Sequence, residues 1–145
     1  MTCAEVMTPS PTCCTAQHTA IEAAELMERE DVGLVPVVSE DGKKLIGVLT
    51  DRDIVLKVVA QGRDPRSTAV TEVMSTDLVT CLPQESVETV MELMATRQVR
   101  RIPIVERDGS VIGIVAQADV ATRIANPQET GQVVQAISEP ATQGA

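Results

Sequence analysis

The pattern of apolar and polar residues predicts helices and strands in a regular order. Residues 20–30 carry apolar side chains at the spacing of one helix face, and Thr19 and Glu22 have the spacing of a capping box at its start. Thr2 and Glu5 have the same spacing, which predicts one short helical turn near the N-terminus. Two prolines between these helices predict an extended connection.

Two short runs of branched apolar residues follow, 34–38 and 45–49, with a glycine-containing turn between them. This arrangement is typical of paired antiparallel strands. Another helix is expected from about residue 51 to residue 60, and Gly62 and Pro65 end it. The first half of the chain is therefore predicted to have the order β-α-β-β-α.

The second half repeats the first. Val6–Met7 recurs as Val73–Met74, and the two halves match over a stretch of some fifty positions, at an offset of 67 residues that becomes 66 after one residue is dropped in the second turn. Such agreement is the mark of an internal duplication. The matching elements are extended at 78–82, helical from Ser86 to 97, strands at 102–105 and 111–115, and helical at 117–124.

We therefore expect an α/β (α+β) fold in which two pseudo-twofold-related β-α-β-β-α repeats pack through their sheets. Residues 1–66 would form the first repeat with its linker and residues 67–126 the second. Residues 127–145 read as a polar tail, with one helix near 132–137. Two repeats are too few for a solenoid, so a pseudo-symmetric pair is the natural interpretation.

Composition restricts the function further. Hydrophobic residues make up 43% of the 145 residues, but none is aromatic, so the core must be aliphatic. Twelve basic residues against 21 acidic ones give a formal charge of −9. This balance argues against nucleic-acid partners and against an anionic membrane surface. Because no apolar stretch is long enough to span a bilayer and no signal pattern is evident, a cytoplasmic location is expected.

The four cysteines are Cys3, Cys13, Cys14 and Cys81, and in a chain with an adequate core they are expected to be reduced. Cys13, Cys14 and His18 could supply zinc ligands, but no second ligand pair stands at a suitable spacing, so no metal is expected. Redox sensing by Cys13, Cys14 and Cys81 is an alternative that the sequence leaves open.

The most informative chemistry lies where each second strand meets the helix after it. Asp53 follows Gly47 by six residues, and Asp119 follows Gly113 by the same number. A carboxylate there can accept hydrogen bonds from the two hydroxyls of a sugar. The same residues could instead only cap their helices, and Thr50 could itself be the N-cap.

These segments, in this order and duplicated, resemble the cystathionine β-synthase (CBS) domain pair, also called a Bateman module, and in particular its small stand-alone members. The resemblance covers roughly residues 3 to 126. The segments that carry it are Val6-Met7-Thr8-Pro9, Val35-Pro36-Val37-Val38, Gly47-Val48-Leu49-Thr50-Asp51-Arg52-Asp53 and their counterparts in the second repeat.

The resemblance implies two clefts that bind adenosine nucleotides in many members. Asp53 and Asp119 would then bind the ribose hydroxyls, and Thr50 would bind the ribose or a phosphate. Arg100 and Arg101 would meet phosphates, although they could also be a solvated pair on an acidic surface. Aliphatic walls and backbone contacts for the adenine would come from Val35, Pro36, Val37, Ile102, Pro103, Met7, Thr8 and Met74.

The two predicted sites are unequal. Gly33 and Leu34 stand where the second repeat has Arg100 and Arg101, and Ala116 stands where the first repeat has Thr50. One strong site and one vestigial site are therefore expected rather than two equal ones.

A catalytic role is not expected, because the chain has one histidine and lacks the glycine patterns of nucleotide-hydrolysing and dinucleotide-binding enzymes. The leading hypothesis is a regulatory module with no obligatory cofactor, which binds AMP, ADP, ATP or S-adenosylmethionine. It would form a homodimer and act on an effector protein that the sequence does not name. The alternative is a structural or dimerisation protein with empty clefts, which could respond to thiol oxidation.

Overall fold

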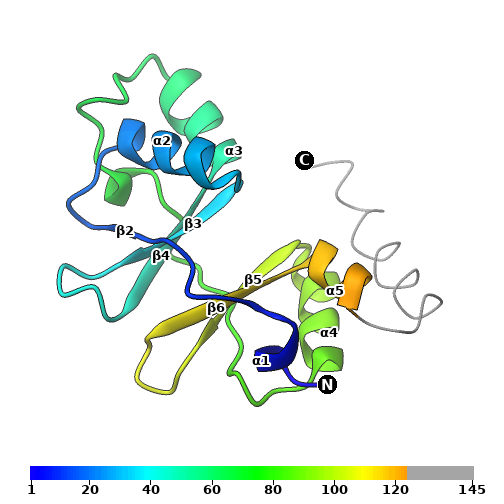
Figure 1. Ribbon diagram of the computed structural model, residues 1–145. Helices are drawn as coiled ribbons and strands as arrows, with labels where there is room; N and C mark the ends of the chain where they lie inside the picture. The colour runs from blue at the N-terminus through cyan, green and yellow to red at the C-terminus, as the bar shows by residue number, and fades with distance from the viewer. Residues whose placement is uncertain (124–145) are drawn as a thin grey trace. The chain divides into compact units, whose positions relative to one another are not determined.

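The computed structural model describes residues 1–123, so the expected tail and its helix lie outside the described residues. The described chain is a mixed α+β fold with two small sheets and helices, as predicted (Figure 1). Its elements, in order, are α1 Cys3–Val6, β1 Thr8–Pro9, β2 Cys14–Thr15, α2 Ala20–Glu30, β3 Leu34–Val38, β4 Leu45–Thr50, α3 Asp51–Ile54, the π-helical turn η1 Val55–Val59, the 3₁₀ turn η2 Val70–Glu72, α4 Val87–Arg97, β5 Arg101–Val105, β6 Val111–Ala116 and α5 Gln117–Arg123.

The chain forms two compact units. Among the described residues, unit 1 comprises 1–10, 79–107 and 112–123, and unit 2 comprises 11–78 and 108–111. The units therefore do not follow the sequence repeats. The first ten residues, which precede the first repeat's helix and strands, belong to the unit that holds the strands of the second repeat.

Unit 2 contains a three-stranded sheet in the order β2-β3-β4. β3 pairs antiparallel with β4, as the two apolar runs predict, and parallel with the short β2. Thr19 caps the start of α2. Its hydroxyl accepts the Glu22 backbone N–H at 3.4 Å, and the Glu22 carboxylate accepts the Thr19 N–H at 3.0 Å. The capping box predicted from these two residues is thus confirmed, and its hydrogen bonds lower the pKa of Glu22.

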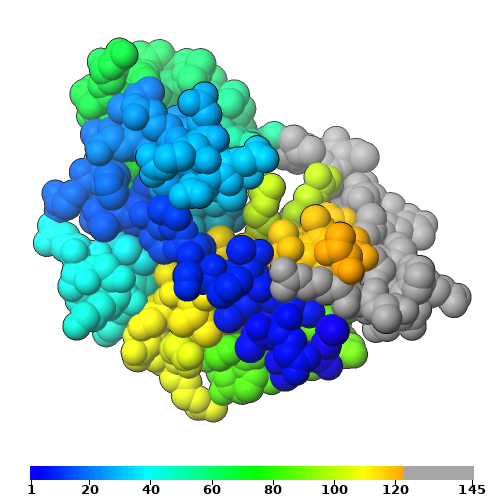
Figure 2. Space-filling model, viewed as in Figure 1, coloured from blue at the N-terminus to red at the C-terminus, as the bar shows by residue number. Residues whose placement is uncertain are grey.

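Unit 1 contains a second three-stranded sheet, in the order β1-β6-β5. β1 pairs antiparallel with β6, placing Thr8 opposite Ile114 and Pro9 opposite Gly113. In Figure 2 the N-terminal residues, in dark blue, lie against the β5–β6 hairpin, in yellow. The predicted extended segment at 78–82 forms one parallel bridge, from Cys81 to Ile104, rather than a full strand.

Each unit is closed by the segment that precedes the other repeat. In unit 1, Thr8 pairs with Ile114 on β6. In unit 2, the equivalent Ser75 exchanges two backbone hydrogen bonds with Val48 on β4, at 2.8 and 3.0 Å. The duplication seen in the sequence is thus also a duplication of hydrogen bonds.

The cores are aliphatic. In unit 2, side chains of α2 pack on Val35, Val37 and Leu49 of the sheet, and Val58 of η1 joins them. In unit 1, α4 packs on Ile102 and Ile104 of β5, and Cys3 and Val6 of α1 fill the same core. Burial of this apolar surface is the main stabilising term for a fold without aromatic residues.

Two local expectations differ from the structure. α1 forms at the predicted place, but the Thr2 side chain makes no cap hydrogen bond. Instead, the N–H groups of Cys3 and Ala4 donate to the carbonyls of Glu85 and Pro83. The neighbouring loop thus supplies hydrogen-bond acceptors for the N–H groups of the first turn.

The second difference is in the helix expected from residue 51 to residue 60. It is α-helical only to Ile54 and continues as the π-helical turn η1, where the N–H of Ala60 donates to the Val55 carbonyl at 2.8 Å. Val55, Val58 and Val59 are branched at Cβ and fit a regular α-helix less readily than unbranched residues do. The pattern of apolar and polar residues predicts a helix here but does not distinguish an α-helical from a π-helical turn.

Candidate functional site

Each unit brings its own set of predicted site residues together, so each candidate site can be described within one unit. In unit 2 the set is built around the junction of β4 and α3 and consists of Val35, Pro36, Val37, Thr50, Asp53 and Met74. In unit 1 it is built around the junction of β6 and α5 and consists of Met7, Thr8, Arg100, Arg101, Ile102, Pro103 and Asp119.

A methionine lies against the glycine of the second strand in both units. A Cβ atom at Gly113 would be 2.3 Å from Sδ of Met7, and one at Gly47 would be 2.4 Å from Sδ of Met74. Only glycine leaves room for the methionine there. The paired glycines of the sequence motif therefore serve the close approach of the segments that carry Met7 and Met74.

At the unit 2 junction, Thr50 and Asp53 form a reciprocal cap. The Asp53 Oδ2 accepts the Thr50 backbone N–H at 2.9 Å, and the Asp53 N–H donates to Thr50 Oγ1 at 3.1 Å. The capping role that the sequence left open for both residues is confirmed. It does not occupy the whole carboxylate, because an ionised carboxylate offers about four lone-pair sites. Contact of Asp53 with a ribose remains a prediction.

Lys57 lies next to this cap. Its Nζ is 3.1 Å from Asp53 Oδ1 and donates to the Val73 carbonyl at 3.1 Å. The sequence analysis did not include Lys57 in the site. The signal was present in the spacing, because residues four apart on a helix face each other. The unit 2 junction therefore presents a positive ammonium group and a negative carboxylate side by side.

At the unit 1 junction, Asp119 caps its helix as Asp53 does in unit 2, but with one hydrogen bond instead of two. The Asp119 Oδ2 accepts the Ala116 backbone N–H at 3.0 Å, as Asp53 does for Thr50. Ala116 has no hydroxyl, so the reciprocal half of the cap has no counterpart. The inequality of the two predicted sites thus extends to their hydrogen bonds.

Arg100 and Arg101 lie beside the start of α5. The N–H of Gln117 donates to the Arg100 carbonyl at 2.8 Å, and both arginine side chains are exposed. In unit 2, the N–H of Asp51 donates to the Gly33 carbonyl at 3.0 Å in the same arrangement. The unit 1 junction therefore has two cations at the place where the unit 2 junction has none.

Most of the aliphatic side chains predicted to contact the adenine are buried in the hydrophobic cores. Val35 and Val37 point into the core of unit 2, and Ile102 and Ile104 point into the core of unit 1. Because side chains alternate along a strand, Pro36 and Pro103 lie on the opposite faces of their sheets, and both are buried. A ligand contact from any of the predicted wall residues remains a prediction.

The residues considered for zinc do not form a metal site in the described chain. His18 Nδ1 accepts the Thr15 backbone N–H at 2.8 Å and so stabilises a turn. Among residues 1–123, no three histidine, cysteine or acidic side chains come close enough to hold a metal ion. Within the same residues, every helix is too short or too polar to cross a membrane.

The described chain thus contains two strand–helix junctions, each with a capping aspartate and an extended segment at the edge of its sheet. The family model of the CBS domain matches residues 3–60 and again residues 70–126. The chain belongs to the CBS domain family and carries two copies of the domain.

Similar proteins cover nearly the whole chain. It is 44% identical over 134 residues to the CBS domain-containing protein YhcV of Bacillus subtilis, covering 92% of this chain and 89% of that protein. It is 33% identical over 140 residues to hypoxic response protein 1 of Mycobacterium tuberculosis, covering 96% and 95%. The expected likeness to small stand-alone CBS pairs is confirmed.

Solved structures show the same fold. A crystal structure of hypoxic response protein I with two coordinated zinc ions matches with a TM-score of 0.78 at 32% identity, covering 86% of this chain and 99% of that one. The CBS domain pair of protein MJ0100, in complex with 5-methylthioadenosine and S-adenosyl-L-methionine, matches with a TM-score of 0.76 at 25% identity, covering 84% and 94%.

Proposed function

We propose that the chain is a regulatory module that binds an adenosine-containing ligand and acts on a partner protein. The observation that carries this proposal is the aspartate at the strand–helix junction of both units, whose carboxylate keeps acceptor capacity beyond its cap. The complex of MJ0100 with two adenosine-containing molecules supports adenosine as the common part of the ligand.

The charges around the two junctions suggest which ligands each would favour. Arg100 and Arg101 beside α5 suit a phosphate, which guanidinium groups bind bidentately. The unit 2 junction has Gly33 and Leu34 at the equivalent positions, and its aspartate, Asp53, is paired with Lys57. We therefore expect AMP, ADP or ATP to favour unit 1, and an adenosine compound without phosphate, such as S-adenosylmethionine, to favour unit 2.

Calorimetric titration of the full chain with AMP, ADP, ATP and S-adenosylmethionine tests the proposal. At least one of the four is expected to bind with a Kd well below about 1 mM, which corresponds to about −4 kcal/mol. Inosine monophosphate is a matched control, because it keeps the ribose and the phosphate and changes the base. If none of the four binds below millimolar concentration, the proposal fails for these ligands.

A bound ligand would act as a signal only if it prefers one arrangement of the chain or of its assembly over another. The effector is not identified by the sequence. The family match supports a regulatory rather than a catalytic role, because stand-alone CBS proteins are typically regulatory. The cytoplasmic location expected from the sequence remains a prediction.

A second candidate function is dimerisation without a ligand, which the surface of η1 favours. Val55, Leu56 and Val59 are 56%, 44% and 65% exposed, and they form an apolar face on one helical turn. An exposed apolar face of this kind is a feature of interaction surfaces. We infer that this face contributes to the homodimer expected from the sequence.

Light scattering of the chain in solution tests the homodimer. Val59→Glu is expected to shift the mass from that of a dimer to that of a monomer, because the new charge would be buried without a partner. Gln61→Glu, two residues further along, adds the same charge off the apolar face and should leave the dimer intact. A wild-type chain that is monomeric at all concentrations would contradict this inference.

A further inference from the structure

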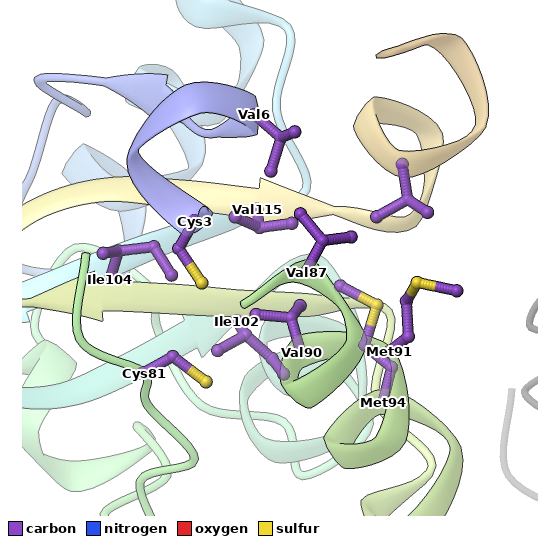
Figure 3. Close-up of a cluster of buried hydrophobic side chains, with 11 residues drawn as sticks. Cys3, Val6, Cys81, Val87, Val90, Met91, Met94, Ile102, Ile104 and Val115 are labelled. Carbon is purple, nitrogen blue, oxygen red and sulfur yellow. The ribbon is translucent and has the colours of Figure 1, made fainter. Parts of the chain in front are cut away.

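Two cysteines from distant parts of the sequence meet inside unit 1. Cys3 of α1 is 0% exposed and Cys81 is 2% exposed. Both belong to the same core, and Figure 3 shows their sulfur atoms pointing into the same interior region beside Ile102. Each thiol is among the groups that shift the pKa of the other, so the two side chains are close neighbours. All four cysteines of the chain are free in this structure.

We propose that Cys3 and Cys81 are a reversible disulfide pair, formed by exchange with a low-molecular-weight disulfide, that locks the N-terminal segment 1–10 onto unit 1. In the first step, the Cys3 thiolate attacks one sulfur of the small disulfide and releases a small thiol. In the second, the Cys81 thiolate attacks the Cys3 sulfur of the mixed disulfide and releases the second small thiol. The protein loses two hydrogen atoms, and the small disulfide is reduced to two thiols.

The backbone around the two cysteines brings them together before any bond forms. The Cys3 N–H donates to the Glu85 carbonyl at 2.9 Å, and the Met1 carbonyl accepts the Val87 N–H at 3.0 Å. Cys81 is held on the other side, where its N–H donates to the Pro103 carbonyl at 3.2 Å and its carbonyl accepts the Val105 N–H at 2.9 Å. Both cysteines are thus fixed by their own backbone rather than by loose loops.

The environment of the pair determines when it reacts. Burial raises the pKa of Cys3 to about 11 and that of Cys81 to about 12, and the Glu85 carboxylate opposes the thiolate of both. Thiolate is the attacking form, so the closed segment reacts slowly at neutral pH. When the segment 1–10 opens, Cys3 leaves with it into solvent and regains ordinary thiol reactivity. Exchange is therefore expected to follow the opening of this segment.

Unit 2 contains a natural control. The hydrogen bond from the Cys3 N–H to the Glu85 carbonyl is repeated in unit 2, where the Val70 N–H donates to the His18 carbonyl at 3.0 Å. Cys14 is the repeat equivalent of Cys81, and Val70 is the equivalent of Cys3. Cys14 and Val70 share the core of unit 2. The two equivalent core positions of unit 2 thus hold one thiol and one valine instead of two thiols.

The test is a titration of the full chain with mixtures of reduced and oxidised glutathione, followed by acid quenching, alkylation and peptide mapping. The expected product is one intramolecular bond between Cys3 and Cys81, while Cys14 stays a thiol. Val70→Cys should then add a second bond, between Cys14 and the introduced thiol. A map in which Cys3 and Cys81 remain thiols at every ratio, or in which either joins Cys13, would overturn the proposal.

A melting experiment gives a second readout, which compares the oxidised and the reduced wild-type chain. The disulfide would close a loop from residue 3 to residue 81, and long loops are constrained most in the unfolded chain. Oxidation of the wild-type chain is expected to raise its Tm by about 5–10 °C. Cys3→Ala should abolish the rise, and Cys13→Ala should retain it. Equal melting temperatures of the oxidised and reduced wild-type chain would also overturn the proposal.

Discussion

Asp53→Asn is expected to weaken the binding of an adenosine ligand at the unit 2 junction by about 10- to 150-fold, or about 1.5–3 kcal/mol. The carboxylate offers acceptors to both ribose hydroxyls, whereas the amide has one oxygen and would present N–H groups to the other hydroxyl. Asparagine keeps an oxygen for the Thr50 N–H, so the helix cap is retained. Calorimetry with the ligand that binds wild-type protein measures the change.

Asp51→Asn is the matched control. Asp51 is exposed, lies on the same helix and accepts only the Arg52 N–H at 2.8 Å. The substitution Asp51→Asn removes the same charge as Asp53→Asn, two residues away, and should leave the affinity for the ligand unchanged. Asp119→Asn, measured with the same ligands, then assigns each ligand to a unit. If neither Asp53→Asn nor Asp119→Asn changes any affinity, the aspartates are caps and nothing more.

Gly113→Ala is expected to lower the free energy of unfolding by about 1–3 kcal/mol, because the new methyl group overlaps the side chain of Met7. The clash involves Cγ of Met7, 2.8 Å away, as well as its sulfur at 2.3 Å. The methionine can therefore not avoid the methyl group by rotating its far end alone. Chemical denaturation measures the change. It is followed by circular dichroism, because the chain has no aromatic residue that could serve as a fluorescent probe.

A double-mutant cycle separates this clash from other effects of the alanine. In a Met7→Ala chain, Gly113→Ala should cost little or even stabilise, because alanine restricts the unfolded chain more than glycine does. The same cycle with Gly47 and Met74 should behave alike, since a Cβ at Gly47 meets Met74 in the same way. An equal cost of Gly113→Ala in both backgrounds would mean that Met7 does not occupy this space.

The sequence predicts most local structure here because each element has its own signal. The apolar stripe of α2, its capping pair Thr19 and Glu22, and the two runs that form β3 and β4 all act within a few residues. The duplication adds a second, independent copy of each signal. The family follows from the same segments, so the prediction of a CBS pair needed no long-range information.

The contacts between distant segments could not be predicted in this way. Nothing in the sequence around Thr8 specifies that it pairs with Ile114 rather than with a strand of its own repeat. The same holds for Cys3, which the sequence analysis left out of its redox alternative although it meets Cys81 in the core. The burial of Val35, Val37 and Ile102 in the cores could not be predicted either, because the alternation of side chains along a strand does not tell which face of the sheet is covered.

The exchanged edge segments bear on how such a protein could have arisen. A single ancestral repeat would have carried one edge segment but could not have used it on its own sheet, if it folded as the present repeats do. Its strand β4 or β6 would have remained open until a second molecule supplied the missing edge. The ancestor would then have been an obligate pair of chains, and gene fusion would only have joined two subunits that already depended on each other.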